Sequence, residues 1–376
     1  MNQRLHWLAL ALTPGLGPAT IKKLLARFGS AEAIFSTPPA ALASCPFLRQ
    51  ESASFLTTRK GELYDAAERE LSLAAENGVS LLGWEDALFP PLLRAIPDPP
   101  PLLYVKGAAQ ALSRRGIAIV GARAASSYGV QVAHKLAADL VRSNLAITSG
   151  LALGVDTAAH RGALAAGGKT IAVLGCGIDI VYPAQNEKLF AQIAEAGALV
   201  SEYPFGTLPE NFRFPARNRI ISGLSLGVVV VEAARRSGTL ITAQQALEQG
   251  REVFVVPGRI DSPKSEGCHR LAQEGAKLIH SVADIIEELP PATSDDRVPR
   301  PKESISPPTK PLADEEQRVF TALEVYPRNI EEIITATGLS ADRVQVLLLH
   351  LELQGLAVSL PGKQYQRLAE PSASSV

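Results

Sequence analysis

The strongest constraint on the fold is an alternation of short apolar runs and amphipathic helices between residues 79 and 279. Strands that are apolar on both faces are typical of parallel sheets, and such sheets need helical crossovers between successive strands. The alternation therefore predicts an α/β fold with a doubly wound, mostly parallel sheet covered by helices on both faces. The expected strands are residues 80–82, 102–105, 116–120, 146–148, 170–174, 198–202, 227–231, 252–256 and 277–279.

The segments on either side of this region predict further domains. A chain of 376 residues is too long for one ordinary core. Residues 1–78 have helical spacing, and 79–289 form the α/β domain. Residues 290–311 are rich in Pro, Ser and charge, as in a linker. Residues 312–370 contain three helices and a hairpin, the order of a winged-helix-like domain.

Composition excludes several classes of protein. With a net charge of −1, any nucleic-acid-binding surface must be a local basic patch, because the chain has no overall excess of positive charge. Three scattered cysteines, Cys45, Cys176 and Cys268, predict neither a disulfide framework nor a zinc site. No apolar run approaches the roughly 20 residues that span a bilayer, and the apolar run 5–12 lacks a signal-peptide cleavage site. We therefore expect a cytoplasmic protein with no metal and no membrane association.

Near the N-terminus a short helix, a Gly-x-Gly turn and a basic helix suggest a helix-hairpin-helix. The turn contains Gly15 and Gly17, and the second helix places Lys22, Lys23 and Arg27 outward. Glycines in such a turn bring backbone amides to a nucleic-acid phosphate. A small packing module with a tight turn explains the same residues equally well.

Residues 201–242 contain two helix starts suited to an anion. The first follows residue 215 and places Arg217, Asn218 and Arg219 in its first turn, and the second opens at Ser237-Gly238-Thr239. Helix starts offer unpaired N–H groups and the positive end of a dipole, so we expect phosphate seats. We place both beside the carboxyl ends of adjacent parallel strands, where α/β sheets bind ligands. Alternatively, the arginines only solvate a helix end.

Other strand ends carry glycine-rich or basic turns, at 121–123, 149–156 and 175–179, with His160 and Lys169 nearby. None has the GxGxxG spacing of a dinucleotide site, so no cofactor is expected. Phosphate-binding turns distributed over several strands suit an extended, repeating anion. Phe212, Phe214 or Tyr203 would then stack a base.

Six motifs of the central region resemble the DNA-processing protein A family (DprA or Smf). They are GAR at 121–123, SGLALGVD at 149–156, GxDxxYPxxN at 177–186, SEYP at 201–204, FPxRNRIISGLS at 214–225 and SGTLITA at 237–243. The resemblance implies an extended Rossmann-like fold with an N-terminal sterile-alpha-motif-like domain and a C-terminal winged-helix-like domain. It further implies a homodimer that binds and protects single-stranded DNA and loads the RecA recombinase on it during natural transformation.

The resemblance carries DNA contacts to Arg123, Lys169, Phe214 and the 217–219 cluster. Combined with the helix starts and glycine turns, the expected DNA-binding set is Gly121, Arg123, Ser149, Gly150, Lys169, Phe214, Arg217, Asn218, Arg219, Ser237, Gly238 and Thr239. The chain departs from the family at His269, where Asn is usual. This histidine is either a pH-sensitive contact at the rim of the pocket or a neutral helix residue.

Two other functions remain open at this point. The fold class includes phosphoribohydrolases of nucleoside monophosphates, whose PGGxGTxxE turn delivers carboxylates. Here Ile241 and Thr242 stand where acids are needed, and Glu232 is the only nearby acid well placed for catalysis. Asp156 and His160 share a helix face, but no nucleophile elbow accompanies them. We therefore expect a binding protein without enzymatic activity. A duplex-binding regulator acting through the terminal domains is the other alternative, although the third C-terminal helix is apolar and acidic.

Overall fold

The computed structural model describes residues 3–291, 312–324 and 327–367, which fall into two compact units, residues 1–299 and 300–376. Each unit is described by itself. Almost all of the expected linker, 290–311, lies outside the described residues. Among the helices that are described, none has the length and apolar character needed to cross a bilayer.

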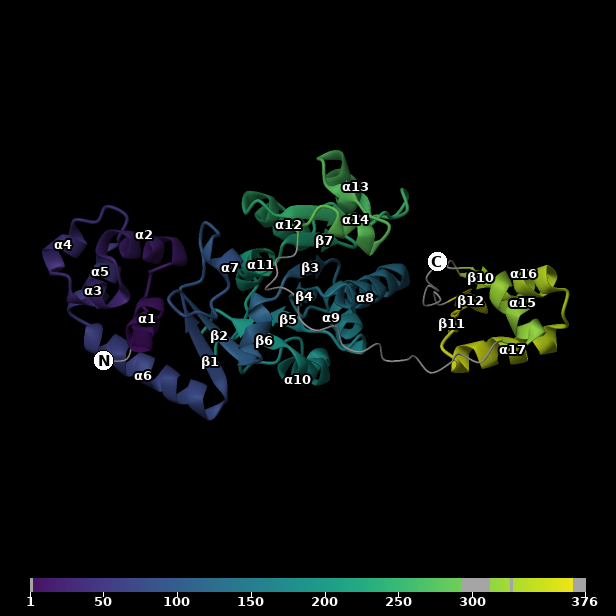
Figure 1. The fold of residues 1–376 in the computed structure, drawn as a ribbon, viewed down its shortest axis with the longest axis horizontal. Helices are drawn as coiled ribbons and strands as arrows, with labels where there is room; N and C mark the ends of the chain where they lie inside the picture. The colour runs from purple at the N-terminus through teal and green to yellow at the C-terminus, as the bar shows by residue number, and fades with distance from the viewer. Residues whose placement is uncertain (1–2, 292–311, 325–326, 368–376) are drawn as a thin grey trace. The chain divides into compact units, whose positions relative to one another are not determined.

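The first unit begins with a segment of short helices (Figure 1). The side chain of Ser30 accepts from the amide of Ala33 and starts the third helix, while Gly29, with φ 91°, ends the second. One helix, α5, was not predicted. The helices are α1 (Gln3–Ala11), α2 (Pro18–Phe28), α3 (Ala31–Ser36), α4 (Pro39–Ala43), α5 (Gln50–Thr57) and α6 (Lys60–Glu76).

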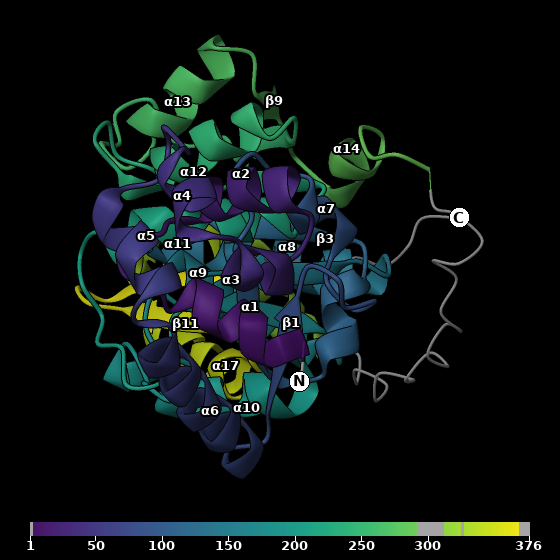
Figure 2. The same cartoon turned by 90° about the vertical axis from the view of Figure 1, so that its left-hand side faces the viewer.

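The helical segment shares an apolar core with one edge of the sheet. Helices α1 and α6 lie beside the first strand in both views (Figure 1 and Figure 2). Trp7 of α1 packs on Trp84, with ring centroids 5.6 Å apart. The hydroxyl of Tyr104 donates to Glu70 of α6 at 2.8 Å. The apolar faces of these helices and of β1 and β2 therefore belong to one core.

A nine-stranded sheet forms the centre of the unit, in the order β1-β2-β6-β5-β4-β3-β7-β8-β9. Only β2 runs antiparallel to the other strands, because it pairs antiparallel with both of its neighbours, β1 and β6. This confirms the predicted α/β, doubly wound, mostly parallel sheet. The strands are β1 (Val79–Gly83), β2 (Leu102–Gly107), β3 (Gly116–Val120), β4 (Ala146–Ser149), β5 (Thr170–Val173), β6 (Ala198–Ser201), β7 (Gly227–Val230), β8 (Glu252–Val255) and β9 (Lys277–Leu278).

Helices cover both faces of this sheet. Alternate strand residues divide between the faces: Ile117 and Ile119 pack with α8 and α9, whereas Ala118 and Val120 share a core with α11 and α12. The helical elements are α7 (Pro91–Arg94), η1 (Ala109–Ser113), α8 (Ser127–Arg142), α9 (Val155–Ala165), η2 (Ala184–Asn186), α10 (Glu187–Ala196), α11 (Arg213–Gly223), α12 (Gly238–Glu248), α13 (Glu266–Gln273) and α14 (Val282–Ile286).

The order of the strands creates a switch point between β3 and β7. From β3 the chain winds through β4 and β5 to β6, and α11 then returns it to the other side of β3. Our expectation that the two helix starts follow adjacent strands is therefore wrong. Helices α11 and α12 follow β6 and β7, which β5, β4 and β3 separate, because α11 is the long crossover between the two halves of the sheet.

The second unit has the winged-helix order and a core of its own. Asn329 caps α16 by accepting from the amide of Glu331, and Gly338, with φ 68°, ends that helix. Val346, Leu349 and Leu353 of α17 are exposed, so the helix that would enter a DNA groove presents apolar side chains. The elements are α15 (Asp314–Ala322), β10 (Arg328–Asn329), α16 (Ile330–Thr337), α17 (Ala341–Leu353), β11 (Ala357–Leu360) and β12 (Gln364–Arg367).

Candidate functional site

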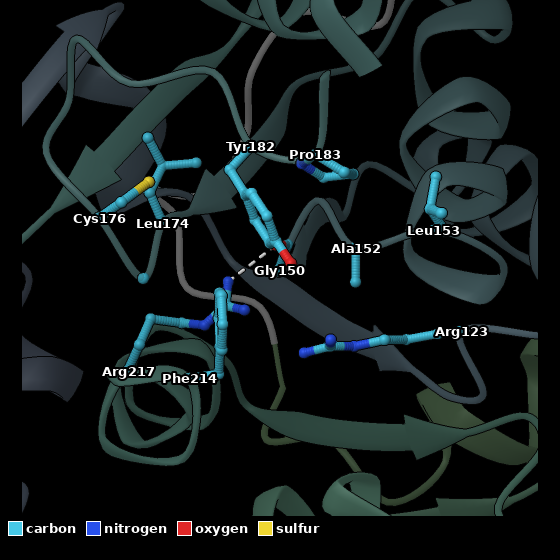
Figure 3. A pocket seen from close by; sticks show the side chains of 11 residues that line it. Arg123, Gly150, Ala152, Leu153, Leu174, Cys176, Tyr182, Pro183, Phe214 and Arg217 are labelled. Atoms are coloured by element: carbon cyan, nitrogen blue, oxygen red, sulfur yellow. Dashed lines mark hydrogen bonds between the residues drawn. The ribbon is translucent and has the colours of Figure 1, made fainter. Parts of the chain in front are cut away.

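A narrow pocket of about 60 Å³ lies at the carboxyl ends of the parallel strands (Figure 3). Turns after β3, β4 and β5 form its floor, and the start of α11 forms one wall. This is the edge of an open α/β sheet at which ligands bind. The lining residues are Arg123, Gly150, Ala152, Leu153, Leu174, Gly175, Cys176, Tyr182, Pro183, Phe214 and Arg217.

Phe214 is the centre of a stack of flat groups in this pocket. The ring of Tyr182 lies on it with centroids 5.4 Å apart and planes inclined by 27°. The guanidinium carbon of Arg123 lies 5.1 Å from the centroid of the same ring. All three side chains converge on the pocket (Figure 3). Gly175 makes the close approach possible, because a Cβ there would come 2.7 Å from Cδ1 of Phe214.

Arg217 supports the pocket from beneath. Its side chain is 4% exposed, and Nη1 donates to the carbonyl oxygens of Gly150, at 2.8 Å, and Val173. Asp156 accepts from the amide of Gly150 at 3.0 Å. Burial lowers the pKa of Arg217 to about 10, and the nearby Asp156 carboxylate opposes that shift. Arg217 thus fastens the ends of β4 and β5 to α11.

Arg219 is likewise engaged within the fold. It forms a two-pronged ion pair with Glu202, at 2.8 and 2.6 Å, and its Nε lies 3.0 Å from Asp98 Oδ2. The side chain is buried. Asn218, between the two arginines, is half-buried. The cluster predicted at 217–219 is therefore near the pocket, but its two guanidinium groups are held by protein oxygens.

Lys169 is not brought to the pocket. It precedes β5, whereas the pocket lies at the end of that strand. In a parallel strand these two positions are at opposite edges of the sheet. The expectation that Lys169 shares a groove with Arg123 is therefore wrong, because the two residues lie at opposite ends of the parallel strands.

The other predicted residues have mixed placements. Ser149 is buried and donates to the carbonyl of Ile119 at 2.6 Å, so it links β4 to β3. Gly121 packs against Val155. Ser237 caps α12 by accepting from the amide of Thr239 at 3.2 Å, which places Gly238, exposed, at the first turn of that helix.

Sequence reasoning missed two groups of side chains at this edge. Arg235 and Arg236 are exposed in the turn after β7, the strand that pairs with β3, and Arg123 lies in the turn after β3. Paired arginines in a strand-to-helix turn were the available signal. Arg213 lies between two rings, 5.0 Å from the centroids of both Tyr203 and Phe212. The edge is thus both cationic and aromatic.

Asp156 and His160 do not form a catalytic pair. Nδ1 of His160 lies 2.7 Å from the hydroxyl of Thr170, and burial lowers the pKa of His160 to about 3, which keeps the ring neutral. Burial also raises the pKa of the Cys176 thiol to about 11. In the part of the chain that the structure describes, no cluster of His, Cys, Asp and Glu fits a metal ion.

Two further predicted contacts have structural roles. Nε2 of His269 lies 3.1 Å from the carbonyl oxygen of Gly258, so this side chain holds the loop after β8. Lys22, expected to point outward from the hairpin, donates to the carbonyl oxygens of Ile96 and Pro97 at 3.1 and 3.2 Å. It therefore ties α2 to the proline-rich segment before β2.

Comparisons with known proteins agree with this architecture. Family models match DNA recombination-mediator protein A over residues 80–290, the DprA winged helix domain over 302–363 and the DprA-like N-terminal HHH domain over 1–52. Protein Smf of Synechocystis is 34% identical over 97% of this chain and 99% of its own.

Two solved structures are also similar. The X-ray structure of DNA processing protein A from Streptococcus pneumoniae has a TM-score of 0.67 and 38% identity, covering 78% of this chain and 99% of that chain. DNA processing protein A from Helicobacter pylori, whose structure concerns a single-stranded DNA binding mode, has a TM-score of 0.51 and 33% identity over 56% of this chain and 94% of that chain. The sequence motifs, the three matched domains and these relatives place the chain in the DNA recombination-mediator protein A family, DprA.

Proposed function

We propose that this protein binds single-stranded DNA along the carboxyl edge of its sheet. The observation that carries the proposal is the stack of Arg123, Phe214 and Tyr182 in the pocket. Ring faces stack on any unpaired base, and an exposed guanidinium takes the adjoining phosphate. The single-stranded DNA binding named for the Helicobacter pylori relative supports the same function.

The cationic side chains extend this site beyond one nucleotide. Arg235 and Arg236 lie in the turn next to that of Arg123, at the switch point between β3 and β7. A strand passing from the pocket to this turn would meet successive guanidinium groups. Such contacts read the phosphate backbone, so affinity is independent of base sequence and falls with salt.

Fluorescence anisotropy with a labelled single strand and its duplex tests this proposal. We expect the single strand to bind more tightly, and Arg123→Glu to weaken binding strongly while the thermal unfolding of the protein is unchanged. Lys169→Glu is the matched control, because it makes the same charge change at the opposite edge of the sheet. Equal binding by the Arg123 variant and the parent protein would refute the site.

We further propose that the bound strand is handed to a recombinase. In this role the protein, as a cytoplasmic homodimer, protects incoming strands during natural transformation and loads RecA on them. Membership of the DprA family supports this proposal. The test is RecA filament assembly on a single strand covered by single-strand-binding protein. Addition of this protein should shorten the lag, and an unchanged lag would refute the loading role.

The same site supports binding without catalysis. A phosphoribohydrolase needs positioned acid–base groups, and Glu232, the nearest acid to the 236–242 turn along the chain, is occupied by a hydrogen bond from the amide of Ser126 at 2.9 Å. Incubation with nucleoside monophosphates should release no free base. Release of free base that the Glu232→Gln variant loses would establish an enzyme instead.

A duplex-binding regulator is less well supported. Groove-reading helices present basic and amide side chains, whereas the exposed face of α17 presents Val346, Leu349 and Leu353. A preference for duplex that is lost on deleting residues after 311 would move the function to the C-terminal unit.

A further inference from the structure

The start of α8 is the helix start nearest the switch point on the β3 side. Helix α8 follows β3 directly, and Ser126 is its N-cap, with an extended backbone and a side chain that accepts from the amide of Gly129 at 3.1 Å. In doubly wound sheets, the helix start next to the switch point is where the phosphate of a compact nucleotide binds. This position is therefore decisive for what the fold can bind.

A carboxylate of the chain itself lies at this helix start. Glu232 follows β7, the neighbour of β3, and its side chain is 5% exposed. Oε2 accepts from the amide of Ser126 at 2.9 Å, and Oε1 accepts from the hydroxyl of the same serine. The carboxylate thus occupies the backbone amide and the hydroxyl of the N-cap residue, two donors that a phosphate at this helix start would use.

Gly129 shows that the first turn of α8 is shaped around this carboxylate. A Cβ at that position would lie 2.6 Å from Cδ and 2.7 Å from Oε2 of Glu232. Any larger residue would push the carboxylate off the helix start. The carboxylate is therefore fitted into the first turn rather than merely close to it.

We propose that Glu232 is a resident anion that takes the place of phosphate at α8 and excludes compact nucleotides from the switch point. A second anion at the same helix start would meet the repulsion of a buried like charge. The exposed guanidinium groups of Arg123, Arg235 and Arg236 lie outside this blocked seat. They are left for an extended strand, and this last step rests on the proposed single-strand binding.

The test is a gain of binding for a small phosphate. Isothermal titration calorimetry at low ionic strength measures adenosine 5′-monophosphate and inorganic phosphate against the full-length protein, Glu232→Ala and Glu232→Gln. We expect at least about a tenfold gain in affinity for both probes in Glu232→Ala, where charge and bulk are removed. A smaller gain is expected in Glu232→Gln, which removes the charge alone. Glu248→Ala, which removes an exposed carboxylate of α12, should show no gain.

Circular dichroism and thermal melts establish that each variant is folded. If Glu232→Ala does not fold, Glu232→Gln decides, because it keeps the shape of the side chain. A folded Glu232 variant that binds neither probe more tightly than the parent protein overturns the proposal. Single-strand binding is measured on the same samples. Its absence in the parent protein would refute the proposed function, while the gain of phosphate binding would still test Glu232 alone.

Discussion

Arg123 and Arg217 both line the pocket, but only one of them is free to contact a bound phosphate. Arg123 is exposed, whereas Arg217 is 4% exposed and is held by two backbone carbonyl oxygens. Only an exposed guanidinium can neutralise a phosphate of a bound strand. We therefore expect Arg123→Ala to change the salt dependence of single-strand binding, and loss of Arg217 to change the affinity alone.

The size of the difference follows from counterion release. Each neutralised phosphate of a single strand contributes about −0.7 to the slope of log K against log salt. Between about 50 and 200 mM salt, one such contact changes the dissociation constant about 2.6-fold, since a concentration ratio of about four is raised to the power of about 0.7. Arg123→Ala should lose this factor, and the Arg217 variant should keep it.

Removal of Arg217 alone carries a risk to the fold. It leaves the carbonyl oxygens of Gly150 and Val173 without their donor and removes the cation nearest to the buried Asp156 carboxylate. The double variant Arg217→Met with Asp156→Asn removes both charges and serves as the folded comparison. Anisotropy across a salt series would refute the reasoning if the slope of the double variant fell as much as that of Arg123→Ala.

Three further predictions follow from the same contacts. Tyr182→Leu, which removes the exposed ring of the stack and leaves Phe214 beside Arg123, should weaken single-strand binding by about 1–3 kcal/mol, the usual value of one base–aromatic stack, with an unchanged salt slope in anisotropy. Burial lowers the pKa of His160 from 6.5 to about 3. Between these two pH values the imidazole is therefore protonated in the unfolded chain but neutral in the folded protein. Stability should therefore fall by up to about 1.4 kcal/mol per pH unit on acidification, and urea melts at about pH 7 and pH 5 should lose this component in His160→Gln. Arg219→Met strands the carboxylate of Glu202 and should cost about 3–5 kcal/mol of unfolding free energy; a change below about 1 kcal/mol in urea melts would contradict a buried pair.

The sheet was predictable because its strands are buried on both faces. Continuous apolar runs such as Gly227–Val230 leave no choice of face, so composition and alternation suffice to find them. Strand order was not predictable in the same way. Nothing in the residues of α11 states that it crosses from β6 to the far side of β3, and the assumed adjacency of the two helix starts failed for that reason.

The site was predictable in its residue types more than in their partners. The sequence places Arg217 and Arg219 in the first turn of a helix but does not say what their side chains meet, and both meet protein oxygens. Tyr182 joins the pocket across the fold, through a turn distant in sequence from Phe214, so no local pattern indicated their stacking. Lys169 could have been excluded from the pocket, because a residue that precedes a parallel strand lies at the amino ends of the strands and the pocket lies at their carboxyl ends.

The core shared by the helical segment and the sheet edge decides which pieces of this protein can exist alone. A chain shortened to start at Val79 would lose Trp7 from its contact with Trp84 and Glu70 from the hydroxyl of Tyr104. The apolar face at β1 and β2 would lie bare beside an unpaired strand edge, the usual origin of aggregation. A chain ending at residue 291 keeps that core whole, because the C-terminal unit is packed around its own. We therefore expect the sheet to tolerate removal of the C-terminal unit and to be destabilised by removal of the helices before Val79.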